Sequence, residues 1–384
     1  MSTTLSTPVT NTSATQNPLQ QLAQYGQSVW LDYIRRDLMS SGELKKMIEQ
    51  DGLGGMTSNP AIFEKAIATG TQYSDLLNAL RPDATLDAKA IFERLAIRDI
   101  QDAAGALRPV YDRSRHRDGY VSLEVSPYLA NKTQETLDEA RRLWAAVNRP
   151  NLMVKVPATA AGIPAVEILL GEGININVTL LFSQDAYEQV AKAYVRALER
   201  RAGQGLDVAN IASVASFFVS RIDTNIDAQL DAKSVNATPE QKALIESVRG
   251  KVAIANAKLA YERYQNIFSG ATWAALAAKG AQTQRVLWAS TSTKNPKLRD
   301  VLYVEELIGA DTVNTIPPAT YDAFRDHGKL RKSLTEDVDG ARTVMANLAK
   351  AGISIEATTG DLLTQGVKLF ADAFTTLLAA IRPA

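Results

Sequence analysis

The feature that most constrains the fold is a regular alternation of two kinds of segment. Eight short apolar or alternating runs are typical of β-strands, and stretches with helical periodicity separate them. The predicted strands are residues 28–34, 54–60, 120–126, 151–157, 176–182, 212–219, 285–291 and 311–317. Strand, helix and strand in repeated order, joined by right-handed crossovers, form a parallel sheet, and eight such units can close on themselves. The sequence therefore predicts an α/β fold, the (β/α)8 TIM barrel.

The segments between the predicted strands carry signals for helices. The stretch SQDAYEQVAKAYVRALERRAG begins at Ser183, a suitable N-cap, and closes near Gly203. The intervals 61–119 and 222–284 are long enough for more than one helix each, and the segment DLLTQGVKLFADAFTTLLAAIR is typical of a last amphipathic helix. We therefore expect a barrel with additional helices.

The domain organisation follows from the distribution of loop-forming residues. No linker rich in Pro, Gly or Ser divides residues 20–384, so we expect one barrel domain over residues 18–384. Residues 1–17 are rich in Ser and Thr and lack Lys and Arg, which is typical of a disordered tail and fits a signal or transit peptide poorly. Two other architectures are weaker: an open doubly wound sheet usually has a Gly-rich phosphate turn, and an antiparallel sandwich does not need the intervening helices.

The composition argues against several classes of function. The 42 basic and 42 acidic side chains of the 384 residues cancel, so no net charge attracts nucleic acid or an anionic membrane. The longest apolar runs fall short of the roughly 20 residues of a membrane helix. The chain lacks cysteine, which excludes disulfides and thiolate chemistry, and its two histidines, His116 and His327, lie apart in charged, loop-like sequence. We expect a cytoplasmic protein that binds small ligands, without a nucleic-acid or membrane partner.

Several predicted strands have one polar face. Side chains alternate along a strand, so Asn177 and Thr179 lie opposite Ile176, Val178 and Leu180. In a (β/α)8 barrel the helices cover the outside, so the polar face points inward, toward the end of the barrel where enzymes of this fold build their sites. The polar residues near the ends of different strands are Asp32, Asn59, Glu124, Lys155, Asn177, Thr179 and Ser216. Their convergence predicts a catalytic site.

Lys155 stands inside the apolar run LMVKVP, where a charged ammonium is costly. Burial disfavours the charged form of an amine, and a neutral amine can attack a carbonyl group and form a Schiff base. The iminium then lets a neighbouring C–C bond break or form through an enamine, with Glu124 and Asp32 as candidate proton shuttles. A buried Lys155–Glu124 ion pair without chemistry is the alternative, and the convergence of the other polar residues argues against it.

Two long motifs, GGMTSNPAIF (54–63) and NLMVKVPATAAGIPAVEILLGEGININVTLLFS (151–183), closely resemble the signature regions of the transaldolase family. The similarity continues through ASFFVSRID to nearly the whole chain beyond residue 20, and WASTSTKNP is similar to the longer bacterial branch. The resemblance implies a class I, Schiff-base enzyme that moves a dihydroxyacetone unit between sugar phosphates in the non-oxidative pentose phosphate pathway. It does not imply a metal or an organic cofactor. It implies that the protein is a monomer or a homodimer.

The resemblance also assigns catalytic roles. It implies that Lys155 forms the Schiff base and that Asp32 is the acid or base for the substrate hydroxyl during C–C cleavage. Glu124 and Thr179 match the pair that holds the water that shuttles protons as the imine forms and is hydrolysed.

The resemblance implies two groups of substrate contacts. The residues similar to those that hold the dihydroxyacetone moiety are Asn59, Asn177 and Ser216. Arg221 in FFVSRID matches the arginine that binds phosphate, and its fork suits bidentate contact. Shorter members have a second arginine in an ASFRN-like sequence, where this chain has ASTSTKN; we assign that role to Lys294, assisted by Ser290 or Ser292.

Two other functions remain as alternatives. The fructose-6-phosphate aldolase branch, which releases free dihydroxyacetone, usually has Gln and Tyr where this chain has Glu124 and Phe218. These two residues favour the transaldolase, and we expect Phe218 to line the substrate site. A silent scaffold that binds sugar phosphates is expected to have lost Lys155, Asp32 or Glu124, and all three are present.

Overall fold

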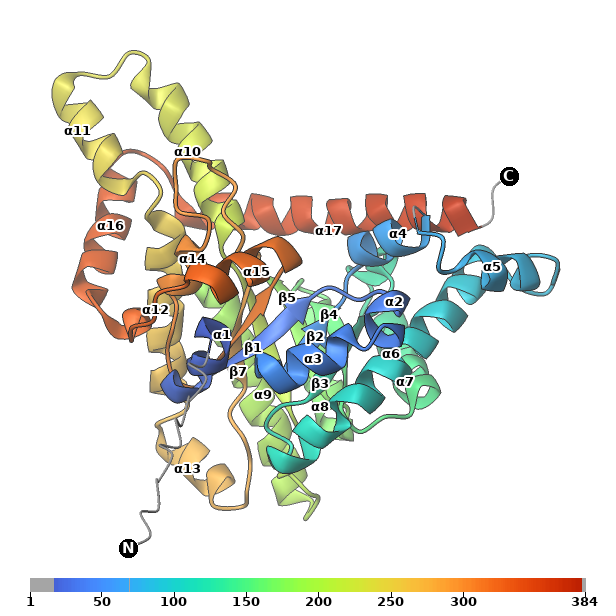
Figure 1. Cartoon of the computed structure of the whole chain (residues 1–384). Coiled ribbons are helices and arrows are strands. Elements are labelled where there is room, and N and C mark those ends of the chain that lie inside the picture. The colour runs from blue at the N-terminus through green and yellow to red at the C-terminus, as the bar shows by residue number, and fades with distance from the viewer. Residues whose placement is uncertain (1–16, 69, 382–384) are drawn as a thin grey trace, which may run out of the picture.

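The computed structural model describes residues 17–68 and 70–381, and its centre is a closed barrel of eight parallel strands (Figure 1). The strands are β1 (Gln27–Asp32), β2 (Gly55–Thr57), β3 (Tyr120–Glu124), β4 (Leu152–Pro157), β5 (Ile176–Leu181), β6 (Ser213–Phe218), β7 (Arg285–Ala289) and β8 (Thr312–Ile316). Each strand pairs with its neighbours in sequence, and β1 pairs with β8 to close the barrel. The predicted (β/α)8 fold is confirmed, and the open sheet and the sandwich are excluded.

Helices fill the connections between the strands. They are α1 (Pro18–Gln21), α2 (Arg36–Ser40), α3 (Glu43–Gln50), α4 (Pro60–Ala68), α5 (Ser74–Leu80), α6 (Ala88–Arg113), α7 (Thr133–Val147), α8 (Gly162–Glu172), α9 (Gln184–Gly203), α10 (Ser220–Ser234), α11 (Pro239–Val248), α12 (Val252–Ile267), α13 (Ala271–Ala277), α14 (Leu302–Glu305), α15 (Pro318–His327), α16 (Val338–Lys350) and α17 (Ile355–Ile381). Short 3-10 turns are η1 (Leu22–Tyr25), η2 (Pro127–Leu129) and η3 (Ser333–Thr335). The two long intervals hold α4 to α6 and α10 to α13, as the sequence predicts.

Local sequence explains where individual helices begin. Ser183 caps α9 as expected, because its Oγ accepts a hydrogen bond from the Ala186 N–H at 3.0 Å. Asn17, the last residue of the predicted tail, caps α1 in the same way and donates to Asp51 at 2.8 Å. Asn17 therefore belongs to the folded part, whereas residues 1–16 of the predicted tail lie outside the described residues.

One hydrophobic cluster extends from Leu19 to Ile381 and includes side chains from the strands and from the helices around them. Strands β4 and β5 are buried along their whole length, because the helices cover their outer faces and the barrel interior is filled with side chains. The single domain expected over residues 18–384 stays a prediction. Among the described residues, no helix is long and apolar enough to cross a membrane.

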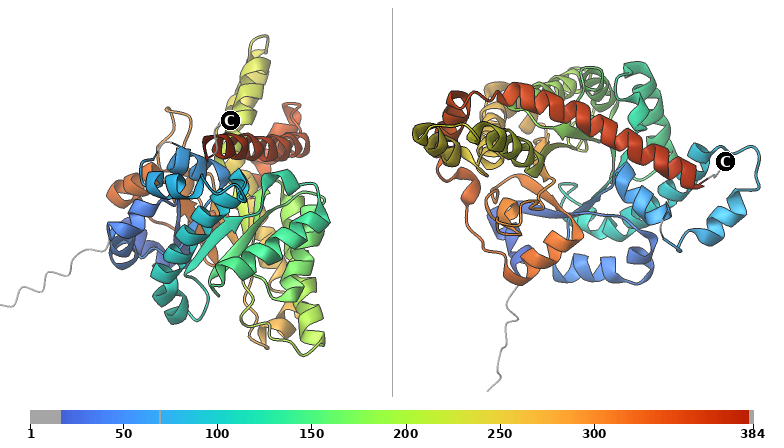
Figure 2. Two further views of the ribbon diagram at one scale, coloured as in Figure 1. Left: turned by 90° about the vertical axis from the view of Figure 1, so that its right-hand side faces the viewer. Right: turned by 90° about the horizontal axis from the view of Figure 1, so that it is seen from above.

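The last helix, α17, lies across the end of the barrel at which the strands finish (Figures 1 and 2). It comes close to β5 at Gly366, where an added Cβ would stand 2.9 Å from Leu180 Cδ2. Leu180 itself has a φ of 60°, and the register between β5 and β6 shifts at this point. The strict alternation predicted for residues 176–182 therefore stops at Leu180, which was placed on the face of Ile176 and Val178.

Candidate active site

The strand ends surround a cavity of about 440 Å³ at the end of the barrel that α17 covers. Eight of the predicted site residues line it, namely Asp32, Asn59, Lys155, Ser216, Phe218, Arg221, Ser290 and Lys294. The other three are Glu124, Asn177 and Thr179. They lie on β3 and β5, the two strands that pair with β4. The barrel thus brings together residues that are up to 262 positions apart in the chain (from Asp32 to Lys294).

Lys155 lies in the middle of this arrangement. Its side chain is only 5% exposed, and β4 places it in register with Glu124 on β3 and Asn177 on β5. Its Nζ donates a hydrogen bond to the Ser58 carbonyl at 3.1 Å and lies 3.6 Å from Glu124 Oε2. The ring of Phe370, from α17, is 5.9 Å from the same nitrogen. The amine therefore reaches the cavity while being shielded from bulk water.

Glu124 ends β3 with a side chain that is 6% exposed. Burial raises the pKa of its carboxyl to about 7, and the positive charge of Lys155 opposes this rise. Its Oε2 has no hydrogen-bond partner among the described residues, and neither does the buried Oγ1 of Thr179. A carboxyl with a pKa near neutrality can both give and take a proton at physiological pH.

Asp32, at the end of β1, is the second carboxyl of the site. Burial raises its pKa, whereas the charge of Lys155 and a hydrogen bond from Thr57 Oγ1 at 2.7 Å oppose the rise. Thr57 Oγ1 also lies 2.6 Å from Thr315 Oγ1 on β8, so a second hydroxyl group positions the threonine that holds this carboxyl.

A row of polar side chains crosses from β3 to β6. Asn177 Nδ2 donates to Ser122 Oγ at 3.0 Å, and Ser216 Oγ donates to Asn177 Oδ1 at 2.6 Å. Asn59 has a local role as well, since its Oδ1 accepts a hydrogen bond from the Ile62 N–H at 3.0 Å and so caps α4. These bonds fix the orientation of the amide groups before any ligand binds.

Positive charge gathers at another part of the cavity. Arg221, near the start of α10, lies 5.7 Å from the ring of Phe218, and burial lowers its pKa. Lys294 donates to Ser292 Oγ at 2.8 Å, and Ser290 Oγ is paired with Ser220 Oγ at 3.0 Å. Both serines line the cavity, so the structure leaves both as candidates to assist Lys294.

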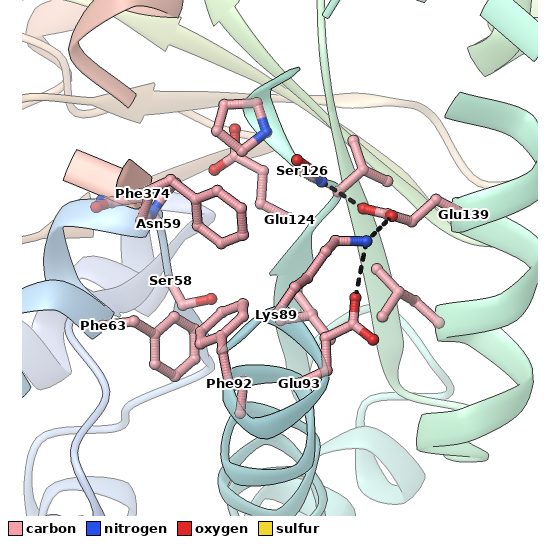
Figure 3. Close-up of a pocket in the computed structure, with 16 residues that line it drawn as sticks. Ser58, Asn59, Phe63, Lys89, Phe92, Glu93, Glu124, Ser126, Glu139 and Phe374 are labelled. Atoms are coloured by element: carbon pink, nitrogen blue, oxygen red, sulfur yellow. Dashed lines mark hydrogen bonds and ion pairs between the residues drawn. The ribbon is translucent and has the colours of Figure 1, made fainter. Parts of the chain in front are cut away.

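A small pocket behind Glu124 holds a charged cluster (Figure 3). Lys89 pairs with Glu93 at 3.1 Å and with Glu139, whose Oε1 accepts a hydrogen bond from the Ser126 N–H at 2.6 Å. Because Ser126 follows Glu124 by two residues, this bond fixes the chain just beyond the end of β3. Phe374 from α17 closes the same pocket.

Sequence reasoning missed several residues of the cavity, among them Tyr33, Thr57, Lys65 and Phe370. Thr57 could have been found, because it stands in the TSNP motif at the end of a predicted strand. Phe370 and Lys65 have no such signal. An amphipathic helix carries many apolar and charged residues, and the sequence does not distinguish these two from the others. The position of α17 over the mouth brings Phe370 to the site.

The histidines lie outside this cavity. His116 Nδ1 is 2.6 Å from Asn210 Oδ1 and its ring stacks on Tyr111, whereas His327 lies between Asp300 and Asp326. Within the described residues, no group of three or more His, Asp or Glu side chains is arranged to hold a metal ion.

A buried lysine between two carboxyls at the mouth of a (β/α)8 barrel is typical of an enzyme, and known proteins show which kind. The sequence profile of the transaldolase/fructose-6-phosphate aldolase family matches residues 29–381. A transaldolase 2 from Nostoc punctiforme is 50% identical over 370 residues, 95% of this chain and 97% of that protein. A transaldolase from Thiobacillus denitrificans is 48% identical over 365 residues, 95% and 99% of the two chains.

The chain belongs to the transaldolase/fructose-6-phosphate aldolase family and, within it, to the transaldolases. The predicted resemblance is confirmed over the part of the chain that carries the barrel. The aldolase, which the sequence left as an alternative, is not favoured by these relatives.

Proposed function

We propose that this enzyme transfers a dihydroxyacetone unit from sedoheptulose 7-phosphate to glyceraldehyde 3-phosphate, giving erythrose 4-phosphate and fructose 6-phosphate, in the cytoplasm. The observation that carries the proposal is the place of Lys155 Nζ, which is shielded from water, faces the cavity and lies 3.6 Å from Glu124 Oε2. The reaction belongs to the non-oxidative pentose phosphate pathway.

In the first step, Lys155 Nζ attacks the carbonyl carbon of the ketose. The carbonyl oxygen then leaves as water, which requires protons to be delivered to it and removed from the nitrogen. Glu124, with a pKa of about 7, is the group that exchanges these protons. Glu124 Oε2 and Thr179 Oγ1 are buried and lack a hydrogen-bond partner among the described residues, which supports a bound water as the carrier between them, since such atoms usually have one.

In the second step, Asp32 accepts the proton of the C4 hydroxyl. The C3–C4 bond breaks, its electron pair moves into the iminium to form an enamine, and erythrose 4-phosphate leaves as the aldehyde. Glyceraldehyde 3-phosphate then takes its place, the enamine carbon attacks the aldehyde, and Asp32 returns the proton to the new hydroxyl. Hydrolysis of the imine releases fructose 6-phosphate. Thr57 holds the Asp32 carboxyl in place through the whole cycle.

The side chains in and around the cavity suit the two ends of such a substrate. Asn59, Asn177 and Ser216 offer fixed polar groups near Lys155 for the hydroxyls of the dihydroxyacetone unit. Arg221 and Lys294 offer positive charge for the phosphate, and the arginine contributes a planar fork of N–H donors.

Borohydride trapping tests this proposal. Incubation with fructose 6-phosphate and borohydride should leave a reduced dihydroxyacetone adduct on Lys155, found by peptide mass spectrometry. The Lys155→Met variant should fold normally, trap nothing and lose transfer activity. An adduct on another residue, or no adduct with active protein, would contradict the proposed role of Lys155. Rapid turnover of fructose 6-phosphate without an acceptor aldehyde would instead indicate the aldolase.

A further inference from the structure

The charged side chains that line the cavity are unequal in sign. Among the described residues, they are the cations Lys65, Lys155, Arg221 and Lys294 and the single carboxylate Asp32. Lys155 is assigned to the proposed chemistry with Glu124 and Asp32, and the other three cations line the same cavity. We call Lys65, Arg221 and Lys294 the cation triad.

The members of the cation triad lie within electrostatic range of one another. Burial lowers the pKa of Lys294, and the positive charges of Arg221 and Lys65 lower it further. The three residues come from different parts of the barrel mouth: Lys65 from the last turn of α4, Arg221 from the first turn of α10, and Lys294 from the loop after β7. Three cations that converge on one cavity repel each other, and a bound anion removes this repulsion.

We propose that Lys65 is a third phosphate ligand, which makes the enzyme select phosphorylated over unphosphorylated ketoses. The inference rests on the proposed function, in which Arg221 and Lys294 bind the phosphate, and adds a specificity-determining residue to it. A phosphate monoester carries a charge of about −1.5 to −2 at neutral pH and three strong acceptor oxygens, so three cationic side chains that line one cavity can each contact it. A ketose without phosphate gains nothing from the cation triad.

The helix gives Lys65 a defined position. Helix α4 begins directly after Asn59, whose side chain caps it, and the helix packs against α17. Lys294, by contrast, stands in an irregular loop, where a serine hydroxyl orients its ammonium. Lys65 therefore presents its charge from a rigid element, which limits the ordering that phosphate binding requires.

The test compares a donor that carries a phosphate with a three-carbon donor that cannot reach a phosphate site. The half-saturating concentration for borohydride trapping on Lys155 is measured with fructose 6-phosphate and with dihydroxyacetone, in the wild type and in Lys65→Met. We expect the value for fructose 6-phosphate to rise about tenfold in the variant, since a charge-assisted contact is worth about that much at a partly exposed site. The value for dihydroxyacetone should stay unchanged.

Inorganic phosphate provides a second readout. Its inhibition constant against fructose 6-phosphate should rise in Lys65→Met by a similar factor, whereas kcat should stay within about twofold. Lys65→Arg keeps the charge and should restore most of the affinity. Lys45→Met is the matched control, because Lys45 lies on α3 with a side chain that is 77% exposed and should leave every value unchanged.

The outcomes separate this inference from the proposed function. If the wild type traps both donors and Lys65→Met binds fructose 6-phosphate and phosphate as the wild type does, the role of Lys65 is refuted and the proposed function stands. An equal loss for both donors would also refute it, because Lys65 would then act through the fold. If the wild type traps neither donor, the proposed function fails and this inference fails with it.

Discussion

Replacing Glu124 by glutamine should stabilise the folded protein at alkaline pH and have little effect on its stability at acidic pH. Burial raises the pKa of Glu124 from 4.5 to about 7, so the folded state keeps this proton at pH values where the unfolded state has lost it. The stability of the wild type must therefore fall as the pH rises from about 4.5 through about 7. Glutamine has a similar size and no charge to bury.

The size of the expected stabilisation follows from the difference between the pKa of Glu124 in the folded and unfolded states. At about 1.4 kcal/mol for each pH unit, the rise from 4.5 to about 7 corresponds to about 3 kcal/mol of unfolding free energy. The side chain is 6% exposed, so solvent screens little of this amount. The Glu124→Gln variant should unfold at nearly the same urea concentration as the wild type at pH 5, and be more stable by about 3 kcal/mol at pH 8.5.

Equilibrium urea unfolding at several pH values, followed by tryptophan fluorescence, measures the difference. Glu49→Gln is the matched control, because Glu49 pairs with Lys45 on the surface and its side chain is 60% exposed. The control should show no comparable gain at alkaline pH. A Glu124→Gln variant whose gain is independent of pH, or largest at pH 5, would refute the reasoning that burial of the carboxylate controls this pKa. The variant should also lose most transfer activity, since it cannot exchange a proton.

Three further changes test other parts of the structure. Arg221→Lys should raise the KM for fructose 6-phosphate about tenfold with little change in kcat, because a lysine lacks the planar fork; an unchanged KM would contradict a bidentate contact between Arg221 and the phosphate. Asp99→Leu should lower the urea unfolding free energy by about 3 kcal/mol or more, because it leaves Arg36 without the buried carboxylate 2.6 Å away. Gly366→Leu should push α17 away from Leu180. Expressed as free energies, the loss in kcat/KM from steady-state assays should exceed the loss in unfolding free energy. Equal losses would contradict a role of α17 in closing the site.

The strands were predictable because their signal is local. A run such as LMVKVP is apolar, β-branched and short, and the structure places β4 at Leu152–Pro157. The predicted strands differ from the observed ones where a helix begins earlier than expected or packs closely against the strand. The predicted strand 54–60 ends at Thr57, because Asn59 and Pro60 already begin α4. The bulge at Leu180 was not predictable from the alternation of residues, since the close approach of α17 is a tertiary feature.

The position of the candidate site was predictable to the extent that its residues lie on the strands. Parallel strands end at the same edge of a barrel, so polar residues at several strand ends must converge, and Asp32 and Lys155 were found in this way. Lys65 and Phe370 lie on helices, where a lysine usually faces solvent and a phenylalanine usually faces the core. Helices α4 and α17 pack against each other, and both residues line the cavity. In this enzyme the strands carry the groups proposed to react, and the helices over the mouth supply part of the surface that would distinguish one substrate from another.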